Sequence, residues 1–548
     1  MENKLSFVDG SLLWPEEIVK NMTSVSINGE VYQTYKNMPS YLYSALKHSA
    51  GLFPDKLCII DDFGQGYSYN DFLTLVDNFS NVLYTNYHVQ NGDHVALLMY
   101  NSIEFCVSFF ALNRLRAVSV PFPTKYKRDE IFSLIDKSDL NGIICDSQFF
   151  KWFHQDDDII PYFLIQVTSR PDTYGLPVFQ SLQTFGALAE PKPEDTAIIM
   201  FTSGTTSLSK GVTLANYNVM HAVSVYQKIF HITESDSSII PVPIYHVTGL
   251  IGLLGLFIFS GGCVRLHKFF DAARILSDIK EFDITFLHGA PTAFFLMLAQ
   301  KEAFPCLPSL RSIACGSSNM PKSKIKELHD WLPDAKFYTV YGLTETSSPA
   351  TIFPGDAAVS PQIGSSGLPI PGTYFKICDE MRKEVLVGTI GSILIKGTVV
   401  LPSYYKLDTP LLTDHWLDTG DLGYFNEDGY LFVVDRKKDM INRGGEKVCS
   451  FDVENALYGI PGISEAAVVG IDDETYGESP AAMVAMAPGF HLTQADIQEL
   501  LKGVLAKFKI PVKIIIADTL PLTPNSKIDK KKIRQLLSNN NSHKTQED

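Results

Sequence analysis

The sequence predicts an α/β protein in which a large N-terminal domain is hinged to a small α+β C-terminal domain. Apolar runs alternate with helical patterns over residues 57–145 and again over 197–352, which is typical of two α/β subdomains with parallel sheets covered by helices. Beyond Gly364 the runs are short and broken by Gly and Pro, which indicates a β-barrel-like subdomain. Helices and strands alternate again after residue 435. We therefore place the domains at 1–435 and 436–538, with a disordered tail at 539–548.

The first α/β subdomain starts near Tyr41, because residues 1–40 carry no strong pattern and are expected to be irregular. Its expected helices are 69–84, 102–113 and 128–137, and its expected strands are 57–61, 94–99, 118–121 and 142–145. The first of these helices has Phe72 and Val76 on one face. Residues 187–195 are rich in Pro and acidic side chains, which predicts a surface linker to the second subdomain.

The second α/β subdomain begins with a buried strand at 197–201, a loop of small and hydroxyl residues ending in Lys210-Gly211, and a helix after Asn216, a good N-cap. Its further strands are expected at 264–267, 284–287, 312–315 and 337–339. Residues 247–264 form an apolar run long enough to cross a membrane. We expect a buried helix instead, because the segments on both sides of the run belong to one soluble fold.

The barrel-like subdomain is expected to contain strands at 375–377, 391–395 and 430–434. In the C-terminal domain we expect helices at 452–458 and 495–507 and strands at 466–470 and 482–485. Thr493 and Asp496 are spaced as a capping pair for the second of these helices.

Composition restricts the class of protein. The net charge of −15 argues against a general nucleic-acid binder, which would show a basic face. The eight cysteines are scattered without a Cys-x-x-Cys pair, which suits reduced thiols better than disulfides or a zinc site. Residues 1–10 lack the apolar core of a signal peptide. The sequence therefore predicts a cytoplasmic protein without a transmembrane segment, and it leaves the oligomeric state open.

The loop that follows the strand at 197–201 has the character of a phosphate-binding segment. Small side chains allow backbone N–H groups to converge on anionic oxygens, hydroxyls add donors, and Lys210 supplies a positive charge. The loop is not a Walker A motif, because Lys210 is followed by Gly211 and Val212 where that motif has Ser or Thr. The alternative interpretation is a solvated turn rich in Ser and Thr.

Four further motifs follow this loop in order: Tyr-Gly-Leu-Thr-Glu-Thr at 341–346, Asp-Thr-Gly-Asp at 418–421, Asp-Arg-Lys-Lys-Asp at 435–439 and Pro-Asn-Ser-Lys at 524–527. Together with the loop they closely resemble the adenylate-forming superfamily of acyl-CoA synthetases, luciferases and peptide-synthetase adenylation domains. The resemblance covers nearly the whole chain, from Leu42 to Ile533. Ser207 and Ser526 stand where this family usually has glycine.

The resemblance implies how the chain would bind ATP and Mg²⁺. Tyr341 would stack on adenine opposite Gly316 and Ser317. Asp421 would accept hydrogen bonds from both ribose hydroxyls, and Glu345 would be the Mg²⁺ ligand. The implied ATP-binding residues are Thr202, Ser203, Gly204, Thr205, Thr206, Lys210, Gly316, Ser317, Tyr341, Gly342, Thr344, Asp421, Arg436 and Lys527, and the implied catalytic residues are Lys527, His246, Thr344 and Glu345.

Several of these assignments have a structural alternative. Glu345 could be an exposed loop acid, and Asp421 a turn aspartate after Gly420. By resemblance, Lys527 inserts between the acid and the α-phosphate and neutralises charge as the adenylate forms. Its neighbours Lys530 and Lys531 compete for this role, and we expect them to be solvated helix residues.

The resemblance also places the acid substrate. His246 would lie beside its carboxylate, where amino-acid-activating relatives have an aspartate one residue earlier to bind the ammonium group. This chain has Tyr245 there, so an α-amino acid is not expected. The implied acyl pocket is apolar and uncharged, and it is lined by His246, Val247, Gly249, the Gly289-Ala290-Pro291-Thr292 segment, Gly316 and Val340. It fits a medium- or long-chain fatty acid or a cinnamate-like aryl acid.

The predicted activity is that of an acid–CoA ligase. Acid and ATP would give an acyl-adenylate and pyrophosphate, and CoA would then give acyl-CoA and AMP. Between these steps the C-terminal domain would rotate about Lys438, so that Gly444 and Gly445 line a tunnel for the thiol. Two alternatives stay open: transfer to the phosphopantetheine of a carrier protein, and a non-catalytic binding relative, which is suggested by Ser207 and Ser526.

Overall fold

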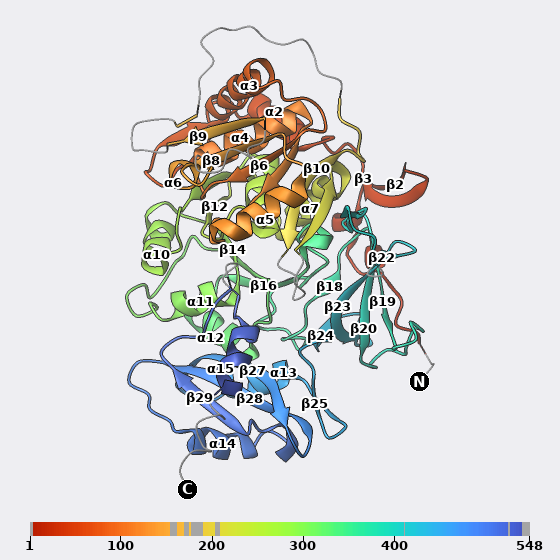
Figure 1. The fold of residues 1–548 in the computed structure, drawn as a ribbon, viewed down its shortest axis with the longest axis vertical. Helices are drawn as coiled ribbons and strands as arrows, with labels where there is room; N and C mark the ends of the chain where they lie inside the picture. Colours follow the sequence, from red (N-terminus) through yellow and green to blue (C-terminus); the bar gives the residue numbers. More distant parts are fainter. Residues whose placement is uncertain are drawn as a thin grey trace.

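The computed structural model describes residues 4–153, 162–168, 175–176, 190–202, 209–409, 412–523 and 527–539. In the described part of the chain, sheets of six, seven, nine and two strands build the large N-terminal domain, and a five-stranded sheet builds the small C-terminal domain. Figure 1 shows the C-terminal domain in blue, below the green and orange α/β layers, with the barrel-like sheet at the side. The predicted fold class and the division into a large and a small domain are confirmed.

The seven-stranded sheet has the order β21-β11-β10-β7-β6-β8-β9. Its parallel part consists of β6 (His94–Leu98), β7 (Val118–Pro121), β8 (Gly142–Asp146), β9 (Phe163–Val167) and β10 (Thr196–Thr202). The helices of this subdomain are α2 (Leu42–Leu52), α3 (Tyr69–Asn86), α4 (Ile103–Leu115) and α5 (Arg128–Ser138). The predicted helices and the strands β6 to β8 are confirmed, with small differences at their ends.

The predicted order of strand, loop and helix around Lys210 is wrong. Lys210 opens a second strand, β11 (Lys210–Ala215), which pairs antiparallel with β10, and helix α7 (Asn216–Phe230) begins only after it. Every residue of β11 after Lys210 is buried, and Val and Thr in such a run favour a strand. Asn216 is not the N-cap, because Ala215 holds that position and its N–H donates to Asn218 Oδ1 at 2.8 Å. The loop therefore connects the end of β10 to the start of β11, and β11 separates it in the chain from α7.

The nine-stranded sheet has the order β18-β17-β16-β15-β14-β12-β13-β4-β5. Its strands are β12 (Ser237–Ile240), β13 (Cys263–Leu266), β14 (Phe286–Gly289), β15 (Ser312–Cys315), β16 (Lys336–Tyr341), β17 (Thr351–Ile352), β18 (Leu368–Pro369), β4 (Leu57–Ile60) and β5 (Gly66–Ser68), with helices α10 (Ala272–Glu281), α11 (Pro291–Leu298) and α12 (Lys322–Trp331). The predicted strand at 57–61 is present as β4, but it pairs with β13 and so belongs to this second sheet. Sequence order alone does not reveal this crossing between subdomains.

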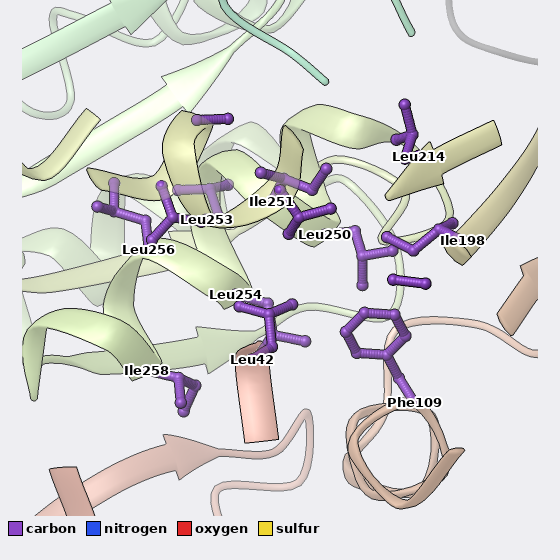
Figure 2. Close-up of a cluster of buried hydrophobic side chains, with 14 of the residues drawn as sticks. Leu42, Phe109, Ile198, Leu214, Leu250, Ile251, Leu253, Leu254, Leu256 and Ile258 are labelled. Carbon is purple, nitrogen blue, oxygen red and sulfur yellow. The ribbon is translucent and has the colours of Figure 1, made fainter. Parts of the chain in front are cut away.

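The apolar run after His246 is a buried helical segment, as predicted. It consists of α8 (Val247–Gly249), the π-helix η2 (Leu250–Gly255) and α9 (Leu256–Ser260). Figure 2 shows Leu250, Ile251 and Leu254 of η2 among side chains of the first subdomain, and all three are fully buried. Among the described residues, no helix is long and apolar enough to cross a membrane.

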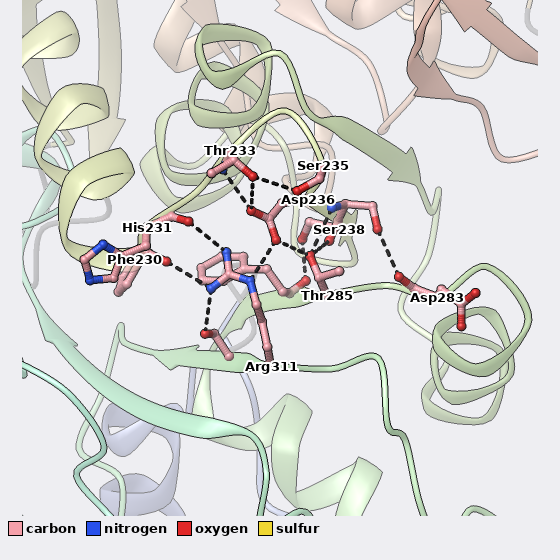
Figure 3. A network of polar contacts seen from close by, with 12 residues as sticks. Phe230, His231, Thr233, Ser235, Asp236, Ser238, Asp283, Thr285 and Arg311 are labelled. Carbon is pink, nitrogen blue, oxygen red and sulfur yellow. Dashed lines mark hydrogen bonds and ion pairs between the residues drawn. The ribbon is translucent and has the colours of Figure 1, made fainter.

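A polar network fixes α7 to the start of the second sheet (Figure 3). Arg311 Nε donates to Asp236 Oδ1 at 2.8 Å, and its guanidinium also donates to the carbonyls of Phe230 and His231 at the end of α7. Asp236 in turn accepts from the Thr285 hydroxyl at 2.8 Å. Because these donors satisfy the free carbonyls at the helix end, α7 and the segment after it are held at one fixed position over the sheet.

The barrel-like sheet contains β1 (Val8–Asp9), β19 (Thr373–Cys378), β20 (Gly391–Gly397), β22 (Leu412–Thr413), β23 (Trp416–Phe425) and β24 (Leu431–Arg436). The prediction that residues 1–40 are irregular is wrong. Strand β1 joins this sheet, and β2 (Met22–Ile27) forms a hairpin with β3 (Glu30–Tyr35). Asn28 and Gly29 turn this hairpin with φ of 51° and 84°. An Asn-Gly pair with both φ values positive is a strong hairpin signal, and it was available in the sequence.

The C-terminal domain contains β25 (Ile441–Arg443), β26 (Glu446–Val448), β27 (Ile463–Asp473), β28 (Gly477–Met486), β29 (Lys513–Ala517), α13 (Ser450–Tyr458), α14 (Gln494–Lys502) and α15 (Lys530–Asn539). The capping pair of Thr493 and Asp496 is confirmed at α14. This helix ends at Lys502 and not at 507, because Gly503 caps it and glycine disfavours continued helix. In the expected tail, Asn539 is the last residue of α15, and 540–548 lie outside the described residues.

Candidate active site

The carboxyl ends of three parallel strands bring predicted site residues to one edge of the nine-stranded sheet. Gly289 ends β14, Gly316 follows β15 and Tyr341 ends β16, and ligands of open α/β sheets bind at such an edge. The Gly316 N–H donates to the Gly289 carbonyl at 3.0 Å. A Cβ on Gly316 would lie 2.9 Å from the Val340 carbonyl oxygen, so the close backbone approach requires glycine. Ser317 has a φ of 70°, a conformation that costs energy in a residue other than glycine.

Gly342 and the segment after it are also tightly packed. A Cβ on Gly342 would lie 1.6 Å from the Ser348 carbonyl oxygen, so no other residue fits without moving the backbone. Thr344 begins the short helix η3 (Thr344–Thr346) directly beside Glu345. This packing fixes the direction in which the Glu345 side chain leaves the backbone.

Asp421 is a buried carboxylate in contact with two other predicted nucleotide-binding residues. Its exposed fraction is 4%. Tyr341 Oη donates to Oδ2 at 2.8 Å, and Arg436 Nε lies 3.4 Å from Oδ1. Burial raises the pKa of Asp421, and the positive charge of Arg436 opposes this rise. Asp421 lies within β23, opposite Arg436 of β24, so the alternative interpretation as a turn aspartate is wrong.

Glu345 is half-buried and interacts with the Tyr404 hydroxyl and with the charges of Lys210 and Arg436. Tyr404 Oη donates to Oε1 at 3.1 Å. Burial raises the pKa of Glu345, while the Tyr404 hydrogen bond and the charges of Lys210 and Arg436 lower it. The alternative interpretation as an exposed loop acid is therefore wrong.

Sequence reasoning missed Tyr404. It lies on β21 (Tyr404–Tyr405), which pairs with β11 so that Val212 is opposite Tyr404. The ammonium of Lys210 lies 5.5 Å from the centre of the Tyr404 ring, a cation–π distance. The paired aromatic residues at 404–405 were the available signal, but nothing local connects them to Glu345.

Lys527 brings a positive charge from the C-terminal domain to the same place. Although the residue is accessible to solvent, the atoms crowded around its ammonium lower its pKa to about 8. The charge of Arg436 also lowers this pKa, while Asp421 and Glu345 raise it, so Lys527 interacts electrostatically with all three groups. The Lys527 N–H donates to Thr523 Oγ1 at 3.2 Å, shortly before α15 begins at Lys530.

The neighbouring lysines differ from each other. Lys530 is not a solvated residue as expected, because its Nζ is paired with Glu454 Oε1 at 2.8 Å and donates to Ser450 Oγ at 2.8 Å. Lys531 is exposed on α15, as expected. Lys530 is thus part of the internal structure of the C-terminal domain, and Lys527 is the lysine that reaches the site.

The predicted acyl-pocket residues lie where η2 meets the sheet edge. The rings of Tyr245 and His246 are 4.6 Å apart, and Val247 and Gly249 form the turn of helix that follows. A Cβ on Gly249 would lie 2.8 Å from the Pro243 carbonyl oxygen. Val340 is 8% exposed on β16.

Part of the predicted phosphate loop lies outside the described residues. Thr202 ends β10 opposite Lys210 of β11, so both ends of the loop are at the site. Ser203, Gly204, Thr205, Thr206 and Ser207 lie outside the described residues, as does Ser526. Their roles stay predictions.

For the predicted hinge at Lys438 and the predicted thiol tunnel at Gly444 and Gly445, the structure gives the local backbone geometry. Lys438 lies in the turn after β24, where the Asp439 N–H donates to the Arg436 carbonyl at 3.0 Å, and burial lowers the pKa of Lys438. Gly444 and Gly445 turn the hairpin of β25 and β26 with φ of 59° and 95°. A two-residue turn of this type requires positive φ, so the hairpin alone accounts for both glycines. Their role in a tunnel stays a prediction.

The residues fit a polyphosphate with a bound divalent cation. Lys210, Arg436 and Lys527 supply positive charge around Glu345 and Asp421. A nearby cation stabilises the charged form of a carboxylate whose pKa is raised by burial. Within the described part of the chain, no group of three or more His, Cys, Asp and Glu side chains could hold a metal ion. A Mg²⁺ ion here would therefore use Glu345 together with phosphate and water oxygens, as is usual for this ion.

Comparison with known proteins agrees with this geometry. The model of the AMP-binding enzyme family matches residues 46–405, and that of the AMP-binding enzyme C-terminal domain matches 452–527. A CoA ligase of Rhodococcus jostii, named for a propanoate that bears a methyl-dioxo-octahydroindenyl group, is 29% identical over 523 residues, which is 91% of this chain and 99% of the relative. The medium-chain fatty-acid–CoA ligase of Escherichia coli is 29% identical over 512 residues, which is 89% of each chain.

A solved structure shows the same fold with ATP bound. O-succinylbenzoate coenzyme A synthetase from Bacillus subtilis, in complex with ATP and a magnesium ion, is 26% identical, with a TM-score of 0.78 over 90% of this chain and 98% of that chain. The family match spans more than half of the chain. This chain therefore belongs to the AMP-binding enzyme family, together with relatives that are acid–CoA ligases.

Proposed function

We propose that this chain is an ATP-dependent acid–CoA ligase that acts through an acyl-adenylate on a hydrophobic carboxylic acid. The observation that carries the proposal is the convergence of Lys527 with Glu345, Asp421 and Arg436. One cation from the C-terminal domain thus interacts electrostatically with two carboxylates of the N-terminal domain. This arrangement suits a reaction in which charge develops at the α-phosphate of ATP.

The first half-reaction follows from these positions. An oxygen of the substrate carboxylate attacks the α-phosphorus, and the bond to the pyrophosphate oxygen breaks, which gives acyl-adenylate and pyrophosphate. Lys527 stabilises the negative charge that builds up on the α-phosphate oxygens. Asp421 and Tyr341 hold the ribose and adenine, so the reacting atoms stay aligned. A Mg²⁺ ion bound at Glu345 supplies positive charge to the triphosphate when present.

In the second half-reaction the thiol of CoA attacks the acyl carbonyl, AMP leaves, and the thiol proton is released. The small domain carries Lys527, and the turn at Lys438 joins it to the large domain. We propose that rotation about this turn withdraws Lys527 and opens the acyl-adenylate to the thiol. The hairpin glycines Gly444 and Gly445 then face the pantetheine arm.

The experiment measures acid-dependent ATP–pyrophosphate exchange first without a thiol acceptor. The proposal predicts exchange with hydrophobic monocarboxylic acids and none with α-amino acids, because Tyr245 cannot bind an ammonium group as a carboxylate does. Addition of CoA should then give acyl-CoA and AMP. Absence of exchange with every acid would support a non-catalytic relative, and transfer to a holo carrier protein but not to CoA would support a carrier-loading enzyme.

A further inference from the structure

His288 is a buried imidazole that the proposed reaction does not use. It lies on β14 directly before Gly289, and 2% of its surface is exposed. Burial lowers its pKa to about 4. The ring is therefore neutral near pH 7, and it lies under the sheet edge where the acid substrate is expected.

The His288 ring fills the space between the π-helix and the sheet edge. A Cβ on Gly252 of η2 would lie 3.2 Å from Nδ1, and a Cβ on Gly316 would lie 3.8 Å from Nε2. Two glycines from different elements thus approach the two nitrogens of one imidazole ring. Because Gly316 is an expected wall of the acyl pocket, an acyl group that extends past Gly316 meets this ring.

Three buried aromatic side chains pack around the His288 ring. The ring of Tyr226 is 5.7 Å from the imidazole, and those of Phe230 and Phe286 are each 6.4 Å away. All three aromatic residues are fully buried. Tyr226 Oη is hydrogen-bonded to Ser348 Oγ at 2.8 Å, which fixes its ring. An alkyl chain could pass only if several of these side chains moved, and close-packed cores resist such insertion.

The residues expected to line the pocket also carry no permanent positive charge that could pair with a second carboxylate. Its residues His246, Val247, Gly249, Gly289, Gly316 and Val340 include no lysine or arginine. A carboxylate at the far end of the substrate would lose its hydration without gaining a counter-ion, and buried unpaired charges are strongly unfavourable.

We propose that His288 forms the end wall of the acyl pocket and restricts the substrate to a compact monocarboxylic acid with an uncharged far end, such as an aryl acid. This inference rests on the proposed acid–CoA ligase function. It favours the cinnamate-like acid over the long-chain fatty acid. It also separates this chain from ligases for substrates with two carboxylates.

The test compares kcat/KM for cinnamate, hexanoate, dodecanoate and adipate, measured by AMP release with CoA present. For the wild-type chain we expect cinnamate and hexanoate to exceed dodecanoate by at least about tenfold and adipate by more, since about 1.4 kcal/mol corresponds to each factor of ten. The variants H288F, H288V and H288A form a graded series. H288F keeps the wall and serves as the control, so its ratio of dodecanoate to cinnamate should stay near that of the wild type. The ratio should rise about tenfold or more from H288F to H288A, with H288V between them.

Each result decides the inference. Efficient use of dodecanoate or adipate by the wild-type chain would overturn it without affecting the proposed function. An unchanged ratio in folded H288A or H288V would also overturn it, and thermal unfolding shows which variants are folded. If no acid supports AMP release, the proposed function itself fails and this inference fails with it.

Discussion

Replacing Asp421 with alanine should weaken the binding of both ATP and AMP. The carboxylate is buried, accepts the Tyr341 hydroxyl at 2.8 Å and lies 3.4 Å from Arg436 Nε. A hydrogen bond to a charged group contributes about 1.5–3 kcal/mol, so the loss of the ribose acceptor should raise Kd roughly 10- to 150-fold. Because the ribose is common to both nucleotides, the factor should be similar for ATP and for AMP.

The chain offers a matched control on the same strand. Asp418 also lies on β23, but its carboxylate is paired with Lys437 Nζ at 3.0 Å and accepts the Gly420 N–H at 3.1 Å. D418A should change Kd by no more than about twofold, as expected for a substitution outside the site. D421N keeps one oxygen acceptor and should fall between D421A and the wild type. The assay is isothermal titration calorimetry, with thermal unfolding to confirm that each variant is folded.

Two outcomes would refute the assignment of Asp421. If D421A and D418A weakened nucleotide binding by the same factor, the effect would come from the strand and not from the ribose contact. If D421A bound AMP as tightly as the wild type, Asp421 would serve Tyr341 and Arg436 structurally, with no direct contact to the nucleotide.

Two further predictions concern the charges around Glu345. The pKa of Lys527 is lowered to about 8 and the reaction requires the protonated lysine, so kcat/KM for ATP should fall as the pH rises through about 8. In K527R the side chain stays charged in this range, so this fall should disappear. The same fall in K527R would contradict the assignment. Y404F removes the hydrogen bond that lowers the pKa of Glu345, so the acidic limb of activity should move to higher pH and more Mg²⁺ should be needed below it. Y405F is the control, because the hydroxyl of Tyr405 donates to Asp139 and not to Glu345. If Y404F and Y405F required the same Mg²⁺ concentration for half-maximal activity, Tyr404 would have no role in Mg²⁺ binding by Glu345.

Elements with strong local signals could be predicted from the sequence. Helix α3 has a regular apolar face, and α14 begins at the capping pair of Thr493 and Asp496. Three of the five motifs located the site through Lys210, Tyr341 and Arg436, which lie at strand ends where the fold brings them together. In these places the local preference of the chain agrees with the tertiary structure.

Features that depend on long-range pairing could not be predicted. The Asp-Thr-Gly-Asp segment resembles a turn, yet it lies within the ten-residue strand β23, because β20 and β24 pair with it on both sides. Gly420 has a φ of 76°, which fits the irregular pairing there. Tyr404 reaches Glu345 only because β21 pairs with β11. Tertiary context decides such strands more than propensity does.

The separation of the two half-reactions tests the account most directly. The measurement follows adenylate formation by ATP–pyrophosphate exchange and thioester formation from supplied acyl-adenylate and CoA, in the wild type, K527A and the control K531A. Lys527 interacts electrostatically with Glu345, Asp421 and Arg436, whereas Lys531 is exposed on α15. The account predicts that K527A lowers exchange by roughly 10²- to 10³-fold, as for other lost stabilisers of transition-state charge, and still makes acyl-CoA from the supplied adenylate, while K531A resembles the wild type in both steps. Equal loss of both steps in K527A, or exchange that stays at the wild-type rate, would contradict it.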